Sequence, residues 1–247
     1  MNKPLSGKIA FVTGGARGIG AAIVRRLARD GAAVAFTYQS SATVADELVT
    51  RIAAEGGRAL AFKADAADPA ALRGAIDAAA AQWGRIDILV NNAGVLLLGS
   101  VDAFSLEDFD KTLAVNVRAV FVAAKAALPH MGAGGRIINI GSTNADRMPF
   151  AGGSAYAMSK SALQGLVQGM ARDLGPRGIT VNNVQPGPTN TDMNPEGGDF
   201  AAGLHGLMAL QRHAHPDEIA GMVAYVAGPE AGFVTGASLT IDGGFKA

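Results

Sequence analysis

The chain has 247 residues, of which 49% are hydrophobic and 17% are charged. This composition supports a sizeable buried core and excludes a disordered protein. Lys plus Arg number 21 and Asp plus Glu number 21, so the net charge is zero, and we do not expect a nucleic-acid partner held by a general positive field. The sequence contains no cysteine, which excludes disulfides, thiolate-bound metals and thiol nucleophiles.

The N-terminal residues 1–8 contain no apolar run of the kind found in a signal peptide. No segment looks like the roughly 18 consecutive apolar residues that a membrane span requires. We therefore expect a soluble cytoplasmic protein with no membrane partner.

Short apolar runs rich in β-branched residues alternate along the chain with longer segments of helical periodicity. Such alternation is typical of parallel βαβ units, so we predict an α/β fold: one Rossmann-like, doubly wound, parallel seven-stranded sheet with helices on both faces. The predicted strands are 8–13, 33–38, 58–63, 86–91, 136–140, 180–184 and 238–241. The predicted helices are 19–30, 42–55, 69–82, 105–128 and 154–174.

Capping residues support several of these helix boundaries. Asp68 precedes Pro69 as a good N-cap, and Ser105 with Asp108 resembles a capping box. Residues 186–213 are rich in Pro, Gly and Asn with weak periodicity, and so long a loop in a compact domain is usually a functional lid. No linker divides the chain, so we predict a single catalytic domain over 1–247.

A glycine-rich segment, TGGARGIG, lies between the first predicted strand and the first predicted helix. Gly14, Gly18 and Gly20 follow the spacing G-x-x-x-G-x-G. Glycines at such a turn allow the backbone to approach a pyrophosphate closely, and the following helix N-terminus provides N–H donors and a positive dipole end. The segment predicts a dinucleotide site.

The residues after the second strand indicate which dinucleotide binds. An NAD site usually has an acidic residue there to hold the ribose 2′-hydroxyl, but no carboxylate occurs between Gly31 and Ala45. Hydroxyl and amide groups take its place, including Tyr38, Ser40 and Ser41, and Arg17 adds a cation within the glycine segment. We therefore predict NADP(H), with the alternative that Arg17 is a solvated loop residue.

Tyr156 and Lys160 lie four residues apart on one predicted helix, close enough to interact. An ammonium group beside a tyrosine stabilises the phenolate and lowers the phenol pKa, which makes tyrosine a usable general acid/base. Alone this spacing is common by chance. Ser142, however, follows the fifth predicted strand at its carboxyl end, where open α/β sheets bind ligands.

Together these motifs occur in the order found in one family. TGGARGIG, Asn91-Asn-Ala-Gly94, Asn116, Ser142, Tyr156 with Lys160, and Pro186-Gly187 make the whole chain resemble a short-chain dehydrogenase/reductase. The resemblance implies hydride transfer between NAD(P) and a carbonyl or alcohol, without a metal. It also implies a catalytic tetrad of Asn116, Ser142, Tyr156 and Lys160. The cofactor-binding residues that it implies, with those predicted above, are Gly14, Arg17, Gly18, Ile19, Gly20, Tyr38, Ser40, Ser41, Asp65, Asn91, Ala93, Gly94, Tyr156, Lys160, Pro186, Gly187 and Thr189.

The tetrad roles are also implied by this resemblance. Ser142 hydrogen-bonds the substrate oxygen, Tyr156 transfers the proton, and Lys160 tunes Tyr156 and binds the nicotinamide ribose. Asn116 holds a water that links Lys160 to solvent. A homotetramer is implied as well, for which alanines in the segment 123–127 give weak independent support.

Two narrower interpretations remain open. The glycine segment and the tetrad are similar to 3-oxoacyl-acyl-carrier-protein reductases, but residues 128–135 lack the basic side chains that would meet an acidic carrier protein. Residues 146–149, 185–195 and 212–213 are similar instead to a bacterial subgroup of cyclic-di-GMP-binding biofilm-dispersal reductases. A nucleotide-binding regulator on a reductase scaffold is therefore the alternative to an enzyme.

Other side chains near the tetrad have plain structural alternatives. Met148, Phe150 and Met193 are either walls of a substrate pocket or ordinary packing, and Arg147 is either a substrate contact or part of a surface salt bridge. We interpret His213-x-His215 as a polar loop rather than a pair of metal ligands.

Overall fold

The computed structural model describes residues 3–198 and 200–247 and contains a seven-stranded parallel sheet. The strand order is β3-β2-β1-β4-β5-β6-β7, which confirms the predicted fold class. Every pairing is parallel. The strands are β1 (Ile9–Val12), β2 (Ala33–Tyr38), β3 (Arg58–Lys63), β4 (Ile88–Asn91), β5 (Arg136–Ile140), β6 (Thr180–Pro186) and β7 (Ser238–Ile241).

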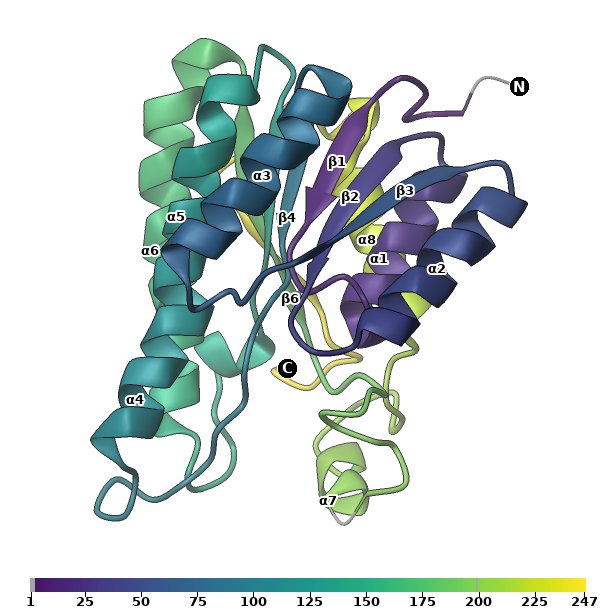
Figure 1. The fold of residues 1–247 in the computed structure, drawn as a ribbon. Helices are drawn as coiled ribbons and strands as arrows, with labels where there is room; N and C mark the ends of the chain where they lie inside the picture. The colour runs from purple at the N-terminus through teal and green to yellow at the C-terminus, as the bar shows by residue number, and fades with distance from the viewer. Residues whose placement is uncertain (1–2, 199) are drawn as a thin grey trace.

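Helices cover both faces of the sheet (Figure 1). On one face lie α1 (Gly18–Arg29), α2 (Ala42–Ala54) and α8 (Pro216–Ala227), and on the other lie α3 (Pro69–Trp83), α5 (Ala119–Ala127) and α6 (Ser154–Leu174). Two shorter helices, α4 (Leu106–Leu113) and α7 (Ala201–His205), lie beyond the ends of the strands. Single-turn helices follow or interrupt these elements at Ala114–Arg118, Leu128–His130, Thr143–Ala145, Gly175–Arg177 and Pro229–Ala231.

The strands alternate their side chains between two apolar layers. In β1, Ala10 and Val12 pack toward α1 and α8, whereas Phe11 packs toward α3 and α5. Because both faces are covered, the central strands β1, β2 and β4 are apolar almost throughout, as expected of a parallel sheet. Strand β6, by contrast, carries buried polar residues such as Asn182, Asn183 and Gln185. The rigid sheet therefore fixes the positions of the loops at its carboxyl edge.

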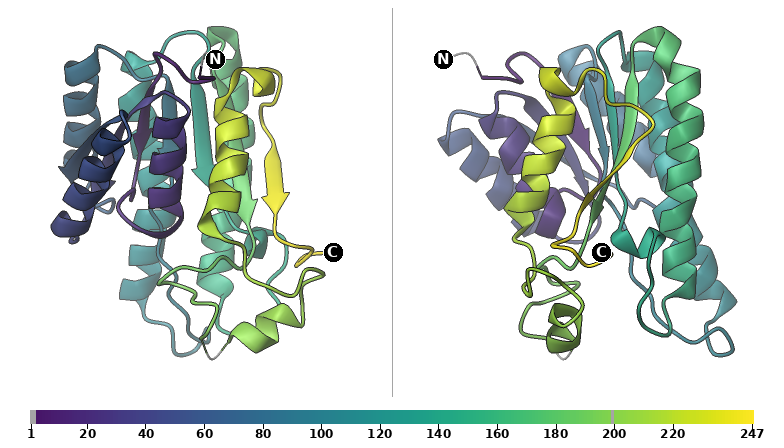
Figure 2. Two further views of the ribbon diagram at one scale, coloured as in Figure 1. Left: turned by 90° about the vertical axis from the view of Figure 1, so that its right-hand side faces the viewer. Right: turned by 180° about the vertical axis from the view of Figure 1, so that it is seen from behind.

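Successive strands are added to one side of β1 up to β3 and to its other side from β4 onward, so β1 and β4 are neighbours. Strands β2 and β3 lie on one side of β1, and β4 through β7 lie on the other. This is the switch point at which open α/β sheets form a crevice for ligands. Figure 2 shows β7 and the C-terminus running alongside β6 toward the same carboxyl edge, from which the loop carrying α7 projects.

The largest differences from the prediction concern two helical regions. The predicted helix 105–128 is divided into α4, a π-helical turn at Ala114–Arg118, and α5. The sequence analysis assigned no helix to 216–227, yet α8 forms there behind a capping box made by His215 and Glu218, with Pro216 in its first turn. Both Asp68 and Ser105 cap their helices as predicted.

The continuous helical segment Leu106–His130 is long and apolar enough to cross a membrane by length and composition alone. Half of its apolar stretch is buried inside the protein. Its alanines pack onto the sheet and onto α3, so the segment has the features of a core helix.

Candidate active site

The glycine loop is held tightly between β1 and β2. Gly14 and Gly18 have φ values of 63° and 55°, which L side chains adopt at a cost. The Gly14 N–H donates to Thr37 Oγ1 at 3.0 Å, and the Gly15 N–H donates to the Thr37 carbonyl at 2.8 Å. Gly15 was not singled out by the spacing, yet a Cβ there would lie 2.5 Å from Phe36 Cβ.

Gly20 and Asn92 close the inner side of this loop. A Cβ on Gly20 would lie 2.2 Å from the Gly14 carbonyl oxygen and 2.5 Å from Asn92 Nδ2. Asn92 Nδ2 donates to the carbonyls of Thr13, at 3.1 Å, and Gly14, at 2.9 Å. Asn92 was not among the predicted residues Asn91, Ala93 and Gly94, although the two consecutive asparagines, Asn91 and Asn92, gave a signal for it.

The outer end of the crevice is lined by polar groups after β2 and β3. Ser41 is the N-cap of α2, and its hydroxyl makes no capping hydrogen bond. Asp65 accepts hydrogen bonds from Gln39 Nε2 at 2.9 Å and from the Ala67 N–H at 2.8 Å. Tyr38 is half-buried at the end of β2, and Ser40 is exposed. These groups form a rim suited to an adenosine and a nearby phosphate.

Arg17 is the residue before α1 and remains largely exposed, with 69% of its side chain accessible. Its guanidinium lies 3.8 Å from the Asp192 carboxylate of the 186–213 loop. Gly18 also faces this loop, because a Cβ there would lie 3.3 Å from Thr191 Cγ2. The 186–213 loop therefore packs directly against the glycine loop.

The residues Ser142, Tyr156 and Lys160 come together at the carboxyl edge, beside the switch point. Ser142 directly follows β5 and caps the turn Thr143–Ala145, its Oγ accepting from the Asn144 N–H at 3.1 Å. Tyr156 and Lys160 lie one turn apart near the start of α6, and Lys160 Nζ lies 5.8 Å from the centre of the Tyr156 ring. Lys160 is buried and donates to the Ile140 carbonyl at 2.8 Å.

The electrostatics differ from the sequence prediction in one respect. Burial raises the pKa of Tyr156, and the nearby Ser142 side chain acts in the opposite direction. The predicted lowering by Lys160 is therefore wrong for this structure, because the ammonium is directed at the Ile140 carbonyl rather than at the phenol oxygen. Burial also lowers the pKa of Lys160 itself, to about 8. Tyr156 is thus a neutral phenol at neutral pH.

Asn116 lies in the π-helical turn, a feature often found at functional sites. Its side chain is buried and exchanges two hydrogen bonds with the Val95 backbone, at 2.9 and 3.0 Å, while Nδ2 also reaches Ser159 Oγ at 3.0 Å. A Cβ on Gly94 would lie 3.4 Å from Asn116 Oδ1 and 3.5 Å from Lys160 Nζ. Gly94 thus lies between Asn116 and Lys160.

Asn91 is placed differently from its neighbours in the Asn-Asn-Ala-Gly segment. Its side chain is 3% exposed and donates to Asn139 Oδ1 at 2.8 Å, across the paired strands β4 and β5. Its side chain is therefore engaged by the neighbouring strand. Ala93, by contrast, donates its backbone N–H to Thr13 Oγ1 at 3.0 Å, beside the glycine loop.

The end of β6 forms the opposite wall. The Pro186 carbonyl accepts from Thr143 Oγ1 at 3.3 Å. Gly187 lets the chain pass close to β7, since a Cβ there would lie 2.7 Å from Asp242 Cα. Thr189 is buried and bridges to Ala214, which fixes the two ends of the 186–213 loop together.

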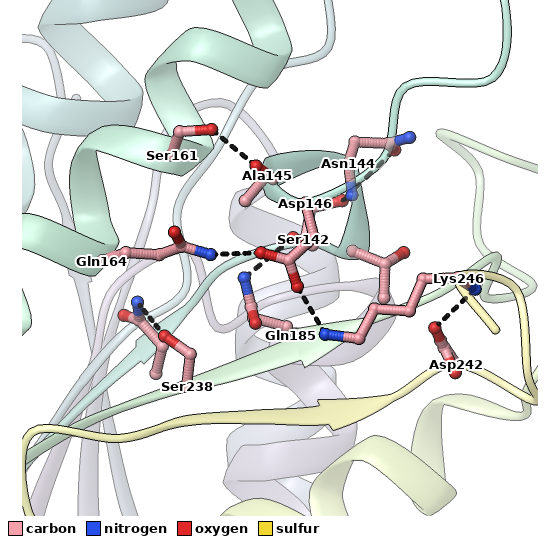
Figure 3. Close-up of polar contacts among 12 residues, drawn as sticks. Ser142, Asn144, Ala145, Asp146, Ser161, Gln164, Gln185, Ser238, Asp242 and Lys246 are labelled. Carbon is pink, nitrogen blue, oxygen red and sulfur yellow. Dashed lines mark hydrogen bonds and ion pairs between the residues drawn. The ribbon is translucent and has the colours of Figure 1, made fainter.

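The loop that carries Ser142 is anchored by the C-terminal segment (Figure 3). Asp146 lies between Gln164 of α6 and Lys246, accepting from each at 2.5 Å. The ammonium of Lys246 holds the pKa of the Asp146 carboxyl below its ordinary value. Arg147 donates to the Phe245 carbonyl at 2.6 Å, so its guanidinium reaches the C-terminal segment. Gln185 Nε2 donates to the Ser142 carbonyl at 3.2 Å.

Comparison with known proteins places this geometry in a family. A family model described as enoyl-(acyl carrier protein) reductase matches residues 14–246. A cyclic-di-GMP-binding biofilm dispersal mediator protein of Escherichia coli is 51% identical over 242 residues, with 98% of each chain covered. A solved short-chain dehydrogenase/reductase from Serratia marcescens is 62% identical with a TM-score of 0.98, covering 99% of this chain and 100% of that one. The chain belongs to the short-chain dehydrogenase/reductase family.

As a member of this family, the protein is an oxidoreductase. A short-chain dehydrogenase of Burkholderia cenocepacia, solved in complex with NADP, is 56% identical with a TM-score of 0.97, over 99% of this chain and 100% of that one. The crevice described above fits such a dinucleotide, because the glycine loop leads into the N-terminal turn of α1, where glycines without side chains leave the backbone N–H groups open to a pyrophosphate.

Proposed function

We propose that this short-chain dehydrogenase/reductase uses NADP(H) to interconvert a carbonyl compound and its alcohol. The observation that carries the proposal is the convergence of Ser142, Tyr156 and Lys160 beside a glycine cradle at the switch point of the sheet. Lys160 is buried and Tyr156 is half-buried, the pKa values of both are shifted, and such perturbed groups gather at functional sites.

The preference for NADP(H) rests on charge at the outer end of the crevice. A 2′-phosphate placed after β2 would meet the free hydroxyl of Ser41, the N-terminus of α2 and the exposed guanidinium of Arg17. Helix N-termini and arginine both favour a phosphate. No carboxylate between Gly31 and Ala45 opposes it. The Burkholderia relative bound to NADP supports the same assignment.

When bound, the reduced nicotinamide supplies the hydride that adds to the carbonyl carbon. Tyr156 supplies the proton to the carbonyl oxygen, and its raised pKa keeps that proton in place at neutral pH. Ser142 positions the same oxygen through its hydroxyl. Hydride and proton together convert the carbonyl to an alcohol, with no metal in the step.

Lys160 and Asn116 complete the proton path in this proposal. A buried amine with a pKa of about 8 exchanges protons readily near neutrality, and its ammonium form can bond a ribose hydroxyl and stabilise the tyrosinate left after proton transfer. Asn116 holds the Val95 backbone and the Ser159 hydroxyl beside Lys160. We therefore assign Asn116 the role of ordering this end of the path.

Cyclic-dinucleotide binding is the second candidate, and the Escherichia coli relative at 51% identity favours it. Carrier-protein docking has less support. Residues 128–135 contain no Lys or Arg, and His130 is already engaged by Asp77 at 3.0 Å. These residues also precede β5, at the edge of the sheet opposite the crevice.

The test is a panel of ketones, aldehydes, oxoacyl thioesters and sugars, with NADPH consumption followed by absorbance. Cyclic-di-GMP binding is measured by calorimetry on the same preparation. Reduction of at least one carbonyl class with NADPH supports the enzyme. Tight cyclic-di-GMP binding with no turnover on any carbonyl would favour the regulator instead.

We also propose that the protein is a homotetramer, assembled through α4, α5 and α6 and through the C-terminal segment. Large apolar side chains are exposed on these helices, with Leu106 at 80%, Phe121 at 53% and Met158 at 42% accessible. Burying such surface between copies is favourable at about 25 cal/mol per Å².

A further inference from the structure

Three side chains of the 186–213 loop that the proposed function does not use lie close together. Glu196, His205 and His213 each present one nitrogen or oxygen atom, and these atoms lie within 4.8 Å of one another. His205 Nε2 and His213 Nδ1 share a hydrogen bond of 2.8 Å, which a metal ion would replace, and Glu196 Oε1 accepts from the His213 backbone N–H at 3.3 Å. Two imidazoles and a carboxylate form the donor set of many three-residue zinc sites.

His213 provides an independent observation. Its side chain is 2% exposed, and its Nε2 has no hydrogen-bond partner among the residues that the structure describes. Buried polar atoms are normally paired, so an unpaired imidazole nitrogen requires an explanation. His215 lies outside this cluster, because its side chain caps α8 and is 66% exposed.

The charges around the cluster leave room for a cation. Arg212, next in sequence to His213, is committed to Glu218 through two hydrogen bonds of 2.7 and 2.8 Å. Glu196 forms no ion pair with any residue in the described part of the chain. Its carboxylate therefore remains available to a cation beside the two imidazoles.

We propose that Glu196, His205 and His213 bind a divalent transition-metal ion of the zinc class. The three residues come from separate parts of one loop: Glu196 precedes α7, His205 ends α7, and His213 lies at the base of the loop. The bound metal links α7 to the segment around His213, next to which Ala214 and Thr189 form an isolated β-bridge. Asp192 and Thr191 of the same loop lie against the glycine loop, so the bound metal holds the 186–213 loop in place beside the cofactor crevice. The metal takes no part in the reaction.

The experiment uses the full chain after removal of metals by chelator dialysis. Zn²⁺ is titrated by calorimetry, and Co²⁺ is titrated separately because its visible absorption reports coordination by nitrogen and oxygen ligands. We expect one equivalent per chain with a Kd of about 1 µM or tighter. His205→Gln and Glu196→Gln should each weaken Zn²⁺ binding at least about tenfold, the lower end of what altering a metal site costs.

His130→Gln is the matched control, because it removes a histidine that pairs with Asp77 away from the loop. It should leave the Zn²⁺ affinity unchanged. Limited proteolysis adds a structural readout: Zn²⁺ should slow cleavage within 196–212 in the unsubstituted protein and not in His205→Gln. NADPH titration of each variant verifies that it is folded.

Three outcomes would overturn the proposal. The unsubstituted protein could show no stoichiometric site, His130→Gln could lose as much affinity as His205→Gln, or Glu196→Gln and His205→Gln could both retain full affinity. Should His205→Gln fail to fold, the exposed and isosteric Glu196→Gln decides the question alone.

Discussion

Replacing Gly20 by alanine should disable the cofactor cradle through a single methyl group. The added Cβ would lie 2.2 Å from the Gly14 carbonyl oxygen and 2.5 Å from Asn92 Nδ2. The first is a backbone atom and the second is held by two hydrogen bonds, so neither can move away easily. Restoring an ordinary contact requires a displacement of about 1 Å in a loop held by Thr37 and Asn92. A misplacement of that size can cost about a hundredfold in function. We expect NADPH affinity to fall at least tenfold, or about 1.4 kcal/mol.

Gly74→Ala is the matched control, because a Cβ on that exposed residue of α3 meets nothing within 4 Å. Removing a glycine from an open helix position stabilises a protein by roughly 0.5–1 kcal/mol, so its melting temperature should rise by about 1–4 °C. NADPH fluorescence titration and thermal unfolding measure both variants. If Gly20→Ala bound NADPH as tightly as the unsubstituted protein, the steric reasoning would be refuted.

Three further predictions follow from charge, burial and surface. Arg17→Ala should remove most of an at least tenfold preference for NADPH over NADH in fluorescence titrations; an equal loss for both cofactors would contradict a 2′-phosphate contact. Burial lowers the pKa of Lys160 from 10.5 to about 8, so the unfolded chain binds more protons between these pH values. The free energy of unfolding should therefore rise with pH across that window relative to Lys160→Met, as denaturant melts would show, whereas a pH-independent difference would count against it. Light scattering should give about four times the monomer mass at micromolar concentration, and a stable monomer would exclude the tetramer.

The strands were predictable because parallel strands buried on both faces have continuous apolar runs. The range 33–38 agrees with β2 at both ends, and 136–140 agrees with β5. The first strand is shorter than predicted, since Lys8 and Thr13 flank β1 rather than belong to it. Helix α8 was overlooked although its start, His-Pro-Asp-Glu, carries capping and first-turn signals.

The residues of the candidate site were predictable from motif and order, but their interactions were not. Nothing local to Asn116 distinguishes a π-helical turn from continuous helix, because the turn depends on hydrogen bonds with Val95, which is 21 residues away. The balance of forces on Tyr156 likewise depends on how deeply the folded chain buries it and on where Lys160 is directed. The proximity of His205 and His213 arises from the path of the loop between them.

The central claim is that Tyr156 donates the proton in an NADPH-dependent carbonyl reduction. Its most direct test is kcat for Tyr156→Phe across pH, on the carbonyl substrate that the panel identifies, with NADPH affinity measured in parallel. We predict a fall in kcat of about 10²–10⁴ at every pH, because the ring remains and only the acid is lost. NADPH affinity should change by less than about 1 kcal/mol, the worth of one neutral hydrogen bond. Full turnover by Tyr156→Phe would contradict the account.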